Sequence, residues 1–196
     1  MIMIHLLSFT FMTLGVCVKN FKQMANDVYE AFKNKDQRRM RKLNDEIMIN
    51  ASASSSPTYL KLSIFSYVLS KILSKPRFLE KSYSSKLDLI ESHLKTLFSI
   101  DEFDPRSDVT FAKLEFAIVD LEKKDKRFVT DLISKGKLKM AATIYAQGFS
   151  LSVASTKVGL EKQEILSYAG ETMMFDRINE ELGIMDRVKI ARKFIS

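Results

Sequence analysis

The sequence SLSVASTKVGLEKQEILSYA, residues 150–169, has the pattern of two short helices joined by a tight turn. Small or apolar residues stand where two crossing helices must bury their side chains, and one glycine separates the helices. These positions are Val153, Ala154, Val158, Gly159, Leu160, Ile165 and Tyr168. Glycine readily adopts the positive φ that such a turn requires. The stretch therefore predicts a helix-turn-helix, with an ordinary helical hairpin as the alternative.

The second helix of this unit is expected to begin near Glu161 and to expose polar residues. Lysine can bond guanine edges and glutamine can bond adenine edges in the major groove of DNA. The candidate DNA contacts within the unit are Lys157, Lys162, Gln163 and Ser167. Glu161 and Glu164 would repel phosphate, so the unit itself carries no net charge. The sequence thus indicates the fold of this unit more strongly than it indicates what the unit binds.

The segment before the unit, Glu122–Gln147, is predicted to be a basic helix. Its apolar stripe is Val129, Ile133, Gly136, Met140 and Ile144. Lys135, Lys137 and Lys139 are its candidate contacts to DNA backbone phosphates, which would set the register of the unit on the duplex. The alternative is a solvated basic face. Gly148 is expected to end this helix, and Ser150 or Ser152 to cap the next one.

The run KMAATIYAQGFSLSVASTKVGLEKQEILSYAGET resembles the helix-turn-helix of small, largely archaeal antitoxin-like regulators. The matching positions are Tyr145, Gly148, Ser150, Leu151, Ala154, Gly159, Glu164, Ile165 and Gly170. Ser155 replaces the second alanine of that pattern. The resemblance implies DNA binding, regulation of an operon and a toxin partner of the PIN-domain nuclease kind. It covers only residues 138–172, so a larger regulator carrying the same unit fits equally well.

The rest of the chain is also helical in pattern. Apolar residues recur at spacings of three and four, which is typical of helices with one buried face. The stripes are Val28, Tyr29 and Phe32; Met40, Leu43 and Ile47; Leu87, Ile90, Leu94 and Leu97; Phe111, Leu114, Ile118 and Leu121. The fold class predicted is all-α, a multi-helix bundle or short helix-pair solenoid with a C-terminal helix-turn-helix.

One predicted helix, residues 58–74, is apolar nearly all round and is expected at the centre of the bundle. Ser56 suits its N-cap and Pro57 its first position. Before it lies a basic run that either faces solvent or contacts phosphate, comprising Lys33, Lys35, Arg38, Arg39, Arg41 and Lys42.

Four segments follow from these patterns: an apolar leader at 1–23, a helical bundle at 24–121, the basic helix and helix-turn-helix at 122–172, and an amphipathic helix at 173–196. The apolar run 1–18 fits either a membrane anchor or a start of translation at Met24, and the sequence favours the latter. The last segment, with its stripe Ile184, Val188, Ala191 and Ile195, either covers the bundle or binds a partner.

Composition limits the function further. The 196 residues carry a net charge of +7, which suits a nucleic-acid or anionic partner. The single Cys17 excludes an internal disulfide, as is usual in a reducing compartment such as the cytoplasm. Two histidines and one cysteine cannot alone form a zinc cluster, and no phosphate loop or nucleophile motif occurs.

We therefore expect no catalytic, cofactor or metal residues. The leading hypothesis is a non-enzymatic cytoplasmic DNA-binding regulator that forms a homodimer. A protein-interaction module, for instance one that binds a toxin, is the second hypothesis, and a membrane-anchored protein is the third.

Overall fold

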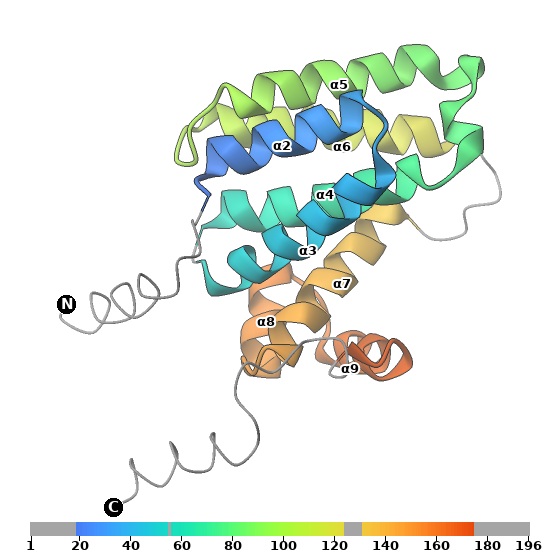
Figure 1. Cartoon of the computed structure of the whole chain (residues 1–196). Coiled ribbons are helices and arrows are strands. Elements are labelled where there is room, and N and C mark those ends of the chain that lie inside the picture. The colour runs from blue at the N-terminus through green and yellow to red at the C-terminus, as the bar shows by residue number, and fades with distance from the viewer. Residues whose placement is uncertain (1–18, 55, 124–130, 175–196) are drawn as a thin grey trace, which may run out of the picture.

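The computed structural model describes residues 19–54, 56–123 and 131–174, and the regular secondary structure in these ranges is helical throughout (Figure 1). This confirms the all-α class. The α-helices are α2 (Phe21–Lys33), α3 (Gln37–Ala53), α4 (Pro57–Leu73), α5 (Ser84–Phe98), α6 (Arg106–Lys123), α7 (Leu132–Ala146), α8 (Leu151–Val158) and α9 (Lys162–Glu171). Two short 3-10 helices, Pro76–Leu79 and Lys81–Tyr83, connect α4 to α5.

Helix α4 is the centre of the bundle, as its composition predicts. It contacts α2, α3, α6 and α7, and most of its side chains are buried. Pro57 is its first residue and Ser56 occupies the N-cap position, but the side chain of Ser56 makes no capping hydrogen bond. Phe65 of α4 stacks on Phe111 of α6, with ring centroids 5.4 Å apart. A helix with no polar face can be stable only in such a position.

The other helices lie on two sides of α4. Helices α2, α5 and α6 pack together on one side, and α7 extends from the other side to α8 and α9 (Figure 1). All the stripe residues predicted for α2, α3, α5 and α6 are buried. One hydrophobic core runs from Phe21 on α2 to Ile165 on α9, so α8 and α9 share the core of the bundle.

The bundle begins earlier than the periodicity suggests. Helix α2 starts at Phe21, before the bundle start predicted at residue 24, and its first turn is held by a capping box between Asn20 and Gln23. The ring of Phe21 is buried and meets Tyr59 edge to face. Residues 20–23 therefore belong to the folded unit. The apolar run 1–18, which fits a membrane anchor by its composition, lies outside the described residues.

The segment Glu122–Gln147 is not one helix, contrary to the prediction. Helix α6 continues to Lys123, and α7 starts at Leu132 with Asp131 as its N-cap. The Asp131 side chain accepts a hydrogen bond from the N–H of Ile133 at 2.8 Å, which stabilises a new helix start at this point. Residues 124–130, with the predicted stripe residue Val129, lie outside the described ranges.

Glu122 joins the end of α6 to the start of α7. Its carboxylate accepts a hydrogen bond from the N–H of Leu132 at 3.0 Å. Burial raises the pKa of Glu122, and the nearby Asp131 adds to this effect; the bond from Leu132 opposes both. The ionised form of Glu122 therefore costs the folded state some stability.

We predict that Glu122→Gln raises the free energy of unfolding at pH 7 by less than about 1 kcal/mol, since solvent screens a half-buried charge. The amide oxygen of glutamine can still accept from Leu132. Because the pKa is raised in the folded state, the cost is absent below pH 4.5 and appears as the pH rises through the folded pKa. Urea denaturation at pH 4 and pH 7 measures this difference.

Glu115→Gln is the matched control, because Glu115 is an exposed residue of the same helix. It should change stability by no more than about 0.5 kcal/mol at either pH. If Glu122→Gln raised the free energy of unfolding equally at pH 4 and pH 7, the pKa of Glu122 would not be raised in the folded state.

Helix α7 lies close to α4 at Gly136. A Cβ atom at this position would come within 3.1 Å of the Ile64 side chain and 3.2 Å of the Ile64 carbonyl oxygen. Ile133, Met140 and Ile144 are buried on the same face of α7, as predicted. The glycine therefore sets the separation of α4 from α7, the helix on which α8 and α9 pack.

Among the described helices, none is long and apolar enough to cross a membrane. The structure describes the chain only to Met174, so the amphipathic helix predicted for the last segment lies largely outside the described residues.

Candidate nucleic-acid interface

Helices α8 and α9 follow α7 through two short turns. Gly148, with φ of +93°, follows the end of α7, and the hydroxyl of Ser150 caps α8 by accepting from the N–H of Val153. Gly159 ends α8 with φ of +72°, as predicted. Helix α9 starts at Lys162 with Glu161 as N-cap, also as predicted.

Ser155 stabilises the turn between α8 and α9. Its hydroxyl donates to the carbonyl oxygen of Leu160 at 2.7 Å, and its carbonyl oxygen accepts from the N–H of Gly159 at 2.8 Å. An alanine could make only the second bond. The residue that departs from the antitoxin-like pattern thus has a local structural role.

The packing of α8 and α9 matches six of the seven predicted core positions. Ala154, Val158 and Ile165 are buried, Leu160 and Tyr168 are partly buried, and Gly159 forms the turn. Val153 is the exception, because its side chain is 38% exposed. The buried stripe of α8 runs through Ala154 and Val158, preceded at helical spacing by the partly buried Leu151, and Val153 lies one residue off it.

Three of the predicted DNA contacts, Lys162, Gln163 and Ser167, are exposed on α9, while Ile165 and Ala169 are buried against the protein. Lys162 stands in the first turn, three and seven residues before the two buried residues, so it lies at the end of their side of the helix rather than opposite them. Gln163 and Ser167 are four residues apart and so share one strip of the helix. The structure therefore places all three side chains on one helix, with Gln163 and Ser167 on one strip and Lys162 apart from it.

Lys157, a predicted DNA contact, is instead bonded within the protein. Its ammonium donates to the carbonyl oxygens of Ser52 and Ser54, at 3.0 and 2.9 Å, and lies over the ring of Phe149. Ser52 lies in the last turn of α3 and Ser54 follows it, where a cation is stabilised by the carbonyl groups of the helix end. Lys157 therefore attaches α8 to the bundle.

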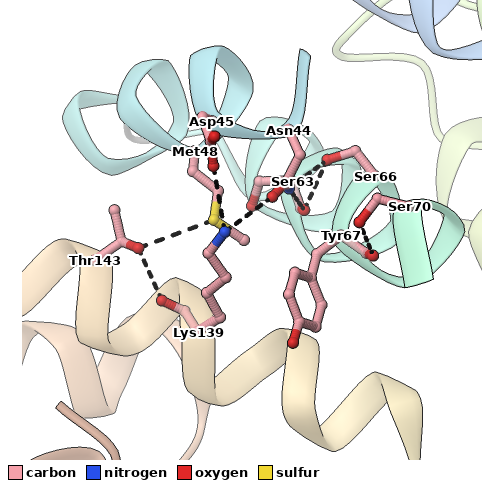
Figure 2. A network of polar contacts seen from close by, with 9 residues as sticks. All are labelled: Asn44, Asp45, Met48, Ser63, Ser66, Tyr67, Ser70, Lys139 and Thr143. Atoms are coloured by element: carbon pink, nitrogen blue, oxygen red, sulfur yellow. Dashed lines mark hydrogen bonds and ion pairs between the residues drawn. The ribbon is translucent and has the colours of Figure 1, made fainter. Parts of the chain in front are cut away.

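Lys139 is also held within the protein. Its ammonium bonds to Asn44 and to Asp45 of α3, each at 3.2 Å, and lies 5.3 Å from the centre of the Tyr67 ring (Figure 2). Lys135 and Lys137 are half-buried on α7. The proposed backbone contacts on α7 thus differ in role, and Lys139 stabilises the contact of α7 with α3.

A basic depression, which the sequence did not reveal, lies between α3, α4 and α7. Its volume is about 140 Å³. It is lined by Arg41, Asn44 and Asp45 of α3, by Tyr67, Ser70 and Lys71 of α4, and by Lys139 of α7. The signal that could have indicated it is Lys71, a charged residue in the otherwise uncharged second half of an apolar helix.

Asn44 organises the floor of the basic depression. It is buried, and its amide nitrogen donates to the carbonyl oxygen of Ser63 and to the hydroxyl of Ser66 (Figure 2). Its amide oxygen accepts from Lys139. With both ends of the amide bonded, Asn44 fixes where the lysine ammonium lies.

Like charges are concentrated at the basic depression. Burial lowers the pKa of Lys71, and the positive charges of Lys139, Arg41 and Lys135 lower it further. Burial likewise raises the pKa of Tyr67, with a smaller contribution from the hydroxyl of Tyr168 on α9. Tyr67 is therefore a neutral hydrogen-bond donor at pH 7, and it links the depression to α9.

The edge of α9 beside Tyr168 is acidic. Glu164 and Glu171 are four residues before and three residues after Tyr168, so they share its side of the helix, and both are exposed. The open strip with Gln163 and Ser167 is thus bordered by carboxylates on the side that faces the basic depression.

Comparison of the chain with family models, with curated proteins and with solved structures finds no match. Within the described ranges, no group of three or more histidine, cysteine, aspartate or glutamate residues is placed to hold a metal ion.

Proposed function

We propose that this protein is a non-enzymatic DNA-binding regulator in which α8 and α9 act as a helix-turn-helix. The observation that carries the proposal is the open face of α9. Gln163 and Ser167 project from the side opposite the buried Ile165 and Ala169, and Lys162 is exposed in the first turn of the same helix. A rigid helix with hydrogen-bonding side chains on one side suits the major groove.

The proposal extends to the assembly on DNA. Helix-turn-helix proteins commonly bind as dimers on paired half-sites, and a homodimer would double the weak contact area of a ten-residue helix. The net charge of +7 supports the attraction to phosphate. By its resemblance to antitoxin-like regulators, the protein would control an operon and bind a toxin.

The test is binding to duplex DNA at increasing salt. We expect affinity to fall about tenfold or more between 50 and 200 mM salt, because phosphate contacts release counterions. The double substitution Lys162→Ala and Gln163→Ala should reduce the preference for one sequence over another by about 1–3 kcal/mol. It should reduce affinity for unrelated sequences much less.

Lys95→Ala is the control, because Lys95 is an exposed lysine on α5, which packs on α2 and α6 on the other side of α4 from α7. It removes one charge without touching α9, so sequence preference should not change. Absence of DNA binding at low salt would refute the proposal.

A protein-interaction module is the second candidate function. It is favoured by the acidic edge of α9 and by exposed apolar side chains near this unit, which are Phe149, Val153, Leu166 and Met173. Exposed aromatic and aliphatic groups beside charges are typical of protein interfaces. Purification of the native protein with a stoichiometric partner would support this function, and recovery of a lone monomer would count against it.

A further inference from the structure

The basic depression has more positive charge than the fold itself requires. Three cations, Arg41, Lys71 and Lys139, line it against one carboxylate, that of Asp45. Asp45 already pairs with Lys139, and its own side chain is largely exposed. Arg41 and Lys71 are thus left as an excess of two positive charges on one concave surface.

This arrangement does not stabilise the protein by itself. Lys71 lies within the field of Lys139, Arg41 and Lys135, and this field together with burial makes its charged form less favourable. Groups that oppose stability in the free protein, gathered in a hollow, are typical of ligand sites. An anion bound between Arg41 and Lys71 would relieve the repulsion.

The other lining groups hold the cations in place. The Tyr67 ring is flanked by the ammonium groups of Lys71 and Lys139, at 5.2 and 5.3 Å from its centre, so all three side chains meet at one place. Asn44 and Asp45 keep Lys139 in position by accepting hydrogen bonds from its ammonium group. A phosphate group carries about one to two negative charges, which matches the excess of two.

We propose that the basic depression binds a phosphate group, with Arg41 and Lys71 as the charged donors and Lys139 as a fixed cation beside them. The phosphate belongs either to a free small anion or to a nucleic-acid backbone. The site does not depend on base contacts by α9, because Arg41, Lys71 and Lys139 lie on other helices and would bind a free phosphate in the same way. Arginine can bond two phosphate oxygens at once, while lysine acts as a point charge.

The first arm of the test uses inorganic phosphate and the full chain. Isothermal titration calorimetry at constant ionic strength should detect phosphate binding to the unaltered protein. The double substitution Arg41→Gln and Lys71→Gln should weaken this binding at least tenfold. Circular dichroism checks folding, which should be intact because removal of Lys71 relieves repulsion.

Arg38→Gln with Lys42→Gln is the matched control, since both residues are exposed on α3 and neither lines the depression. It removes the same charge, so any loss of phosphate binding common to both variants reflects net charge alone. Equal loss in the two variants would overturn the proposal.

The second arm uses a DNA duplex with the same variants. If the ligand is a backbone phosphate, the depression variant should lose about tenfold in affinity for every duplex sequence, and inorganic phosphate should compete. If the ligand is free, phosphate binding depends on Arg41 and Lys71 while DNA binding follows net charge only. The site would be overturned if the unaltered protein bound no phosphate and the depression variant and its control bound DNA equally well. If only the α9 substitutions left sequence preference unchanged, the proposed function would be refuted and the phosphate site would stand.

Discussion

Replacing Gly136 with leucine is expected to lower the free energy of unfolding by about 3 kcal/mol or more. The side chain would enter the contact between α7 and α4, where even a Cβ atom would lie 3.2 Å from the backbone oxygen of Ile64. A backbone carbonyl within a buried helix cannot move aside as a flexible side chain can. The two helices must separate, and the packing of α8 and α9 on α7 would be disturbed with them.

Gly170→Leu is the matched control for this substitution. Gly170 lies in the last turn of α9, is exposed, and a Cβ atom there would meet nothing within 4 Å. Leucine is the better helix former by about 0.8–1 kcal/mol in a helix interior, so stability should be unchanged or slightly higher. Urea denaturation followed by circular dichroism measures both variants. Similar stabilities for the two would show that α7 is not held against α4 at this glycine.

The parts of the fold that the sequence predicted are those determined by local chemistry. The apolar run after Pro57 predicted the central helix, because such a helix has no surface to present to water. Gly159 predicted the turn, because positive φ is costly for other residues. The buried stripes on α2, α3, α5 and α6 followed from periodicity alone.

The break between α6 and α7 shows the limit of periodicity. Residues 122–131 contain neither glycine nor proline, and their charged residues are compatible with a helix. The start of α7 depends on the cap formed by Asp131 and on the bond between Glu122 and Leu132. The first is a local cap that the periodicity of apolar residues does not indicate, and the second joins residues ten positions apart.

The roles of the lysines could not be predicted, because they depend on contacts far apart in the sequence. Lys157 meets carbonyl groups about one hundred positions earlier, and Lys139 meets Asn44 and Asp45 across a similar distance. Lys71 faces the same hollow only because α3, α4 and α7 pack at particular rotations. The sequence shows only that each of these residues carries a positive charge. In the folded protein Lys157 and Lys139 bond to other parts of the chain, whereas Lys71 contributes to the excess positive charge at the basic depression.

Ile165→Asp is expected to destabilise the attachment of α9 by about 4 kcal/mol or more. Ile165 is fully buried, and loss of a buried isoleucine side chain alone costs about 2–5 kcal/mol. The carboxylate must also lose its hydration without gaining a designed partner. Helix α9 packs mainly on α7 and α8, so the effect should be greatest there. Hydrogen exchange followed by mass spectrometry should show lost protection in α8 and α9 while α2, α5 and α6 remain protected.

Leu166→Asp separates the fold of this unit from its proposed binding face. Leu166 is the next residue and is 40% exposed, so an aspartate there should change stability by no more than about 0.5–1 kcal/mol. It nevertheless adds a negative charge four residues after Lys162 and therefore next to it on the helix surface, and it should weaken DNA binding in a protein that remains folded. Weak binding by Ile165→Asp would then follow from unfolding, and weak binding by Leu166→Asp from repulsion of phosphate. Uniform loss of hydrogen-exchange protection in Ile165→Asp would show that α8 and α9 unfold only together with the whole bundle, as their shared core with α2 also permits.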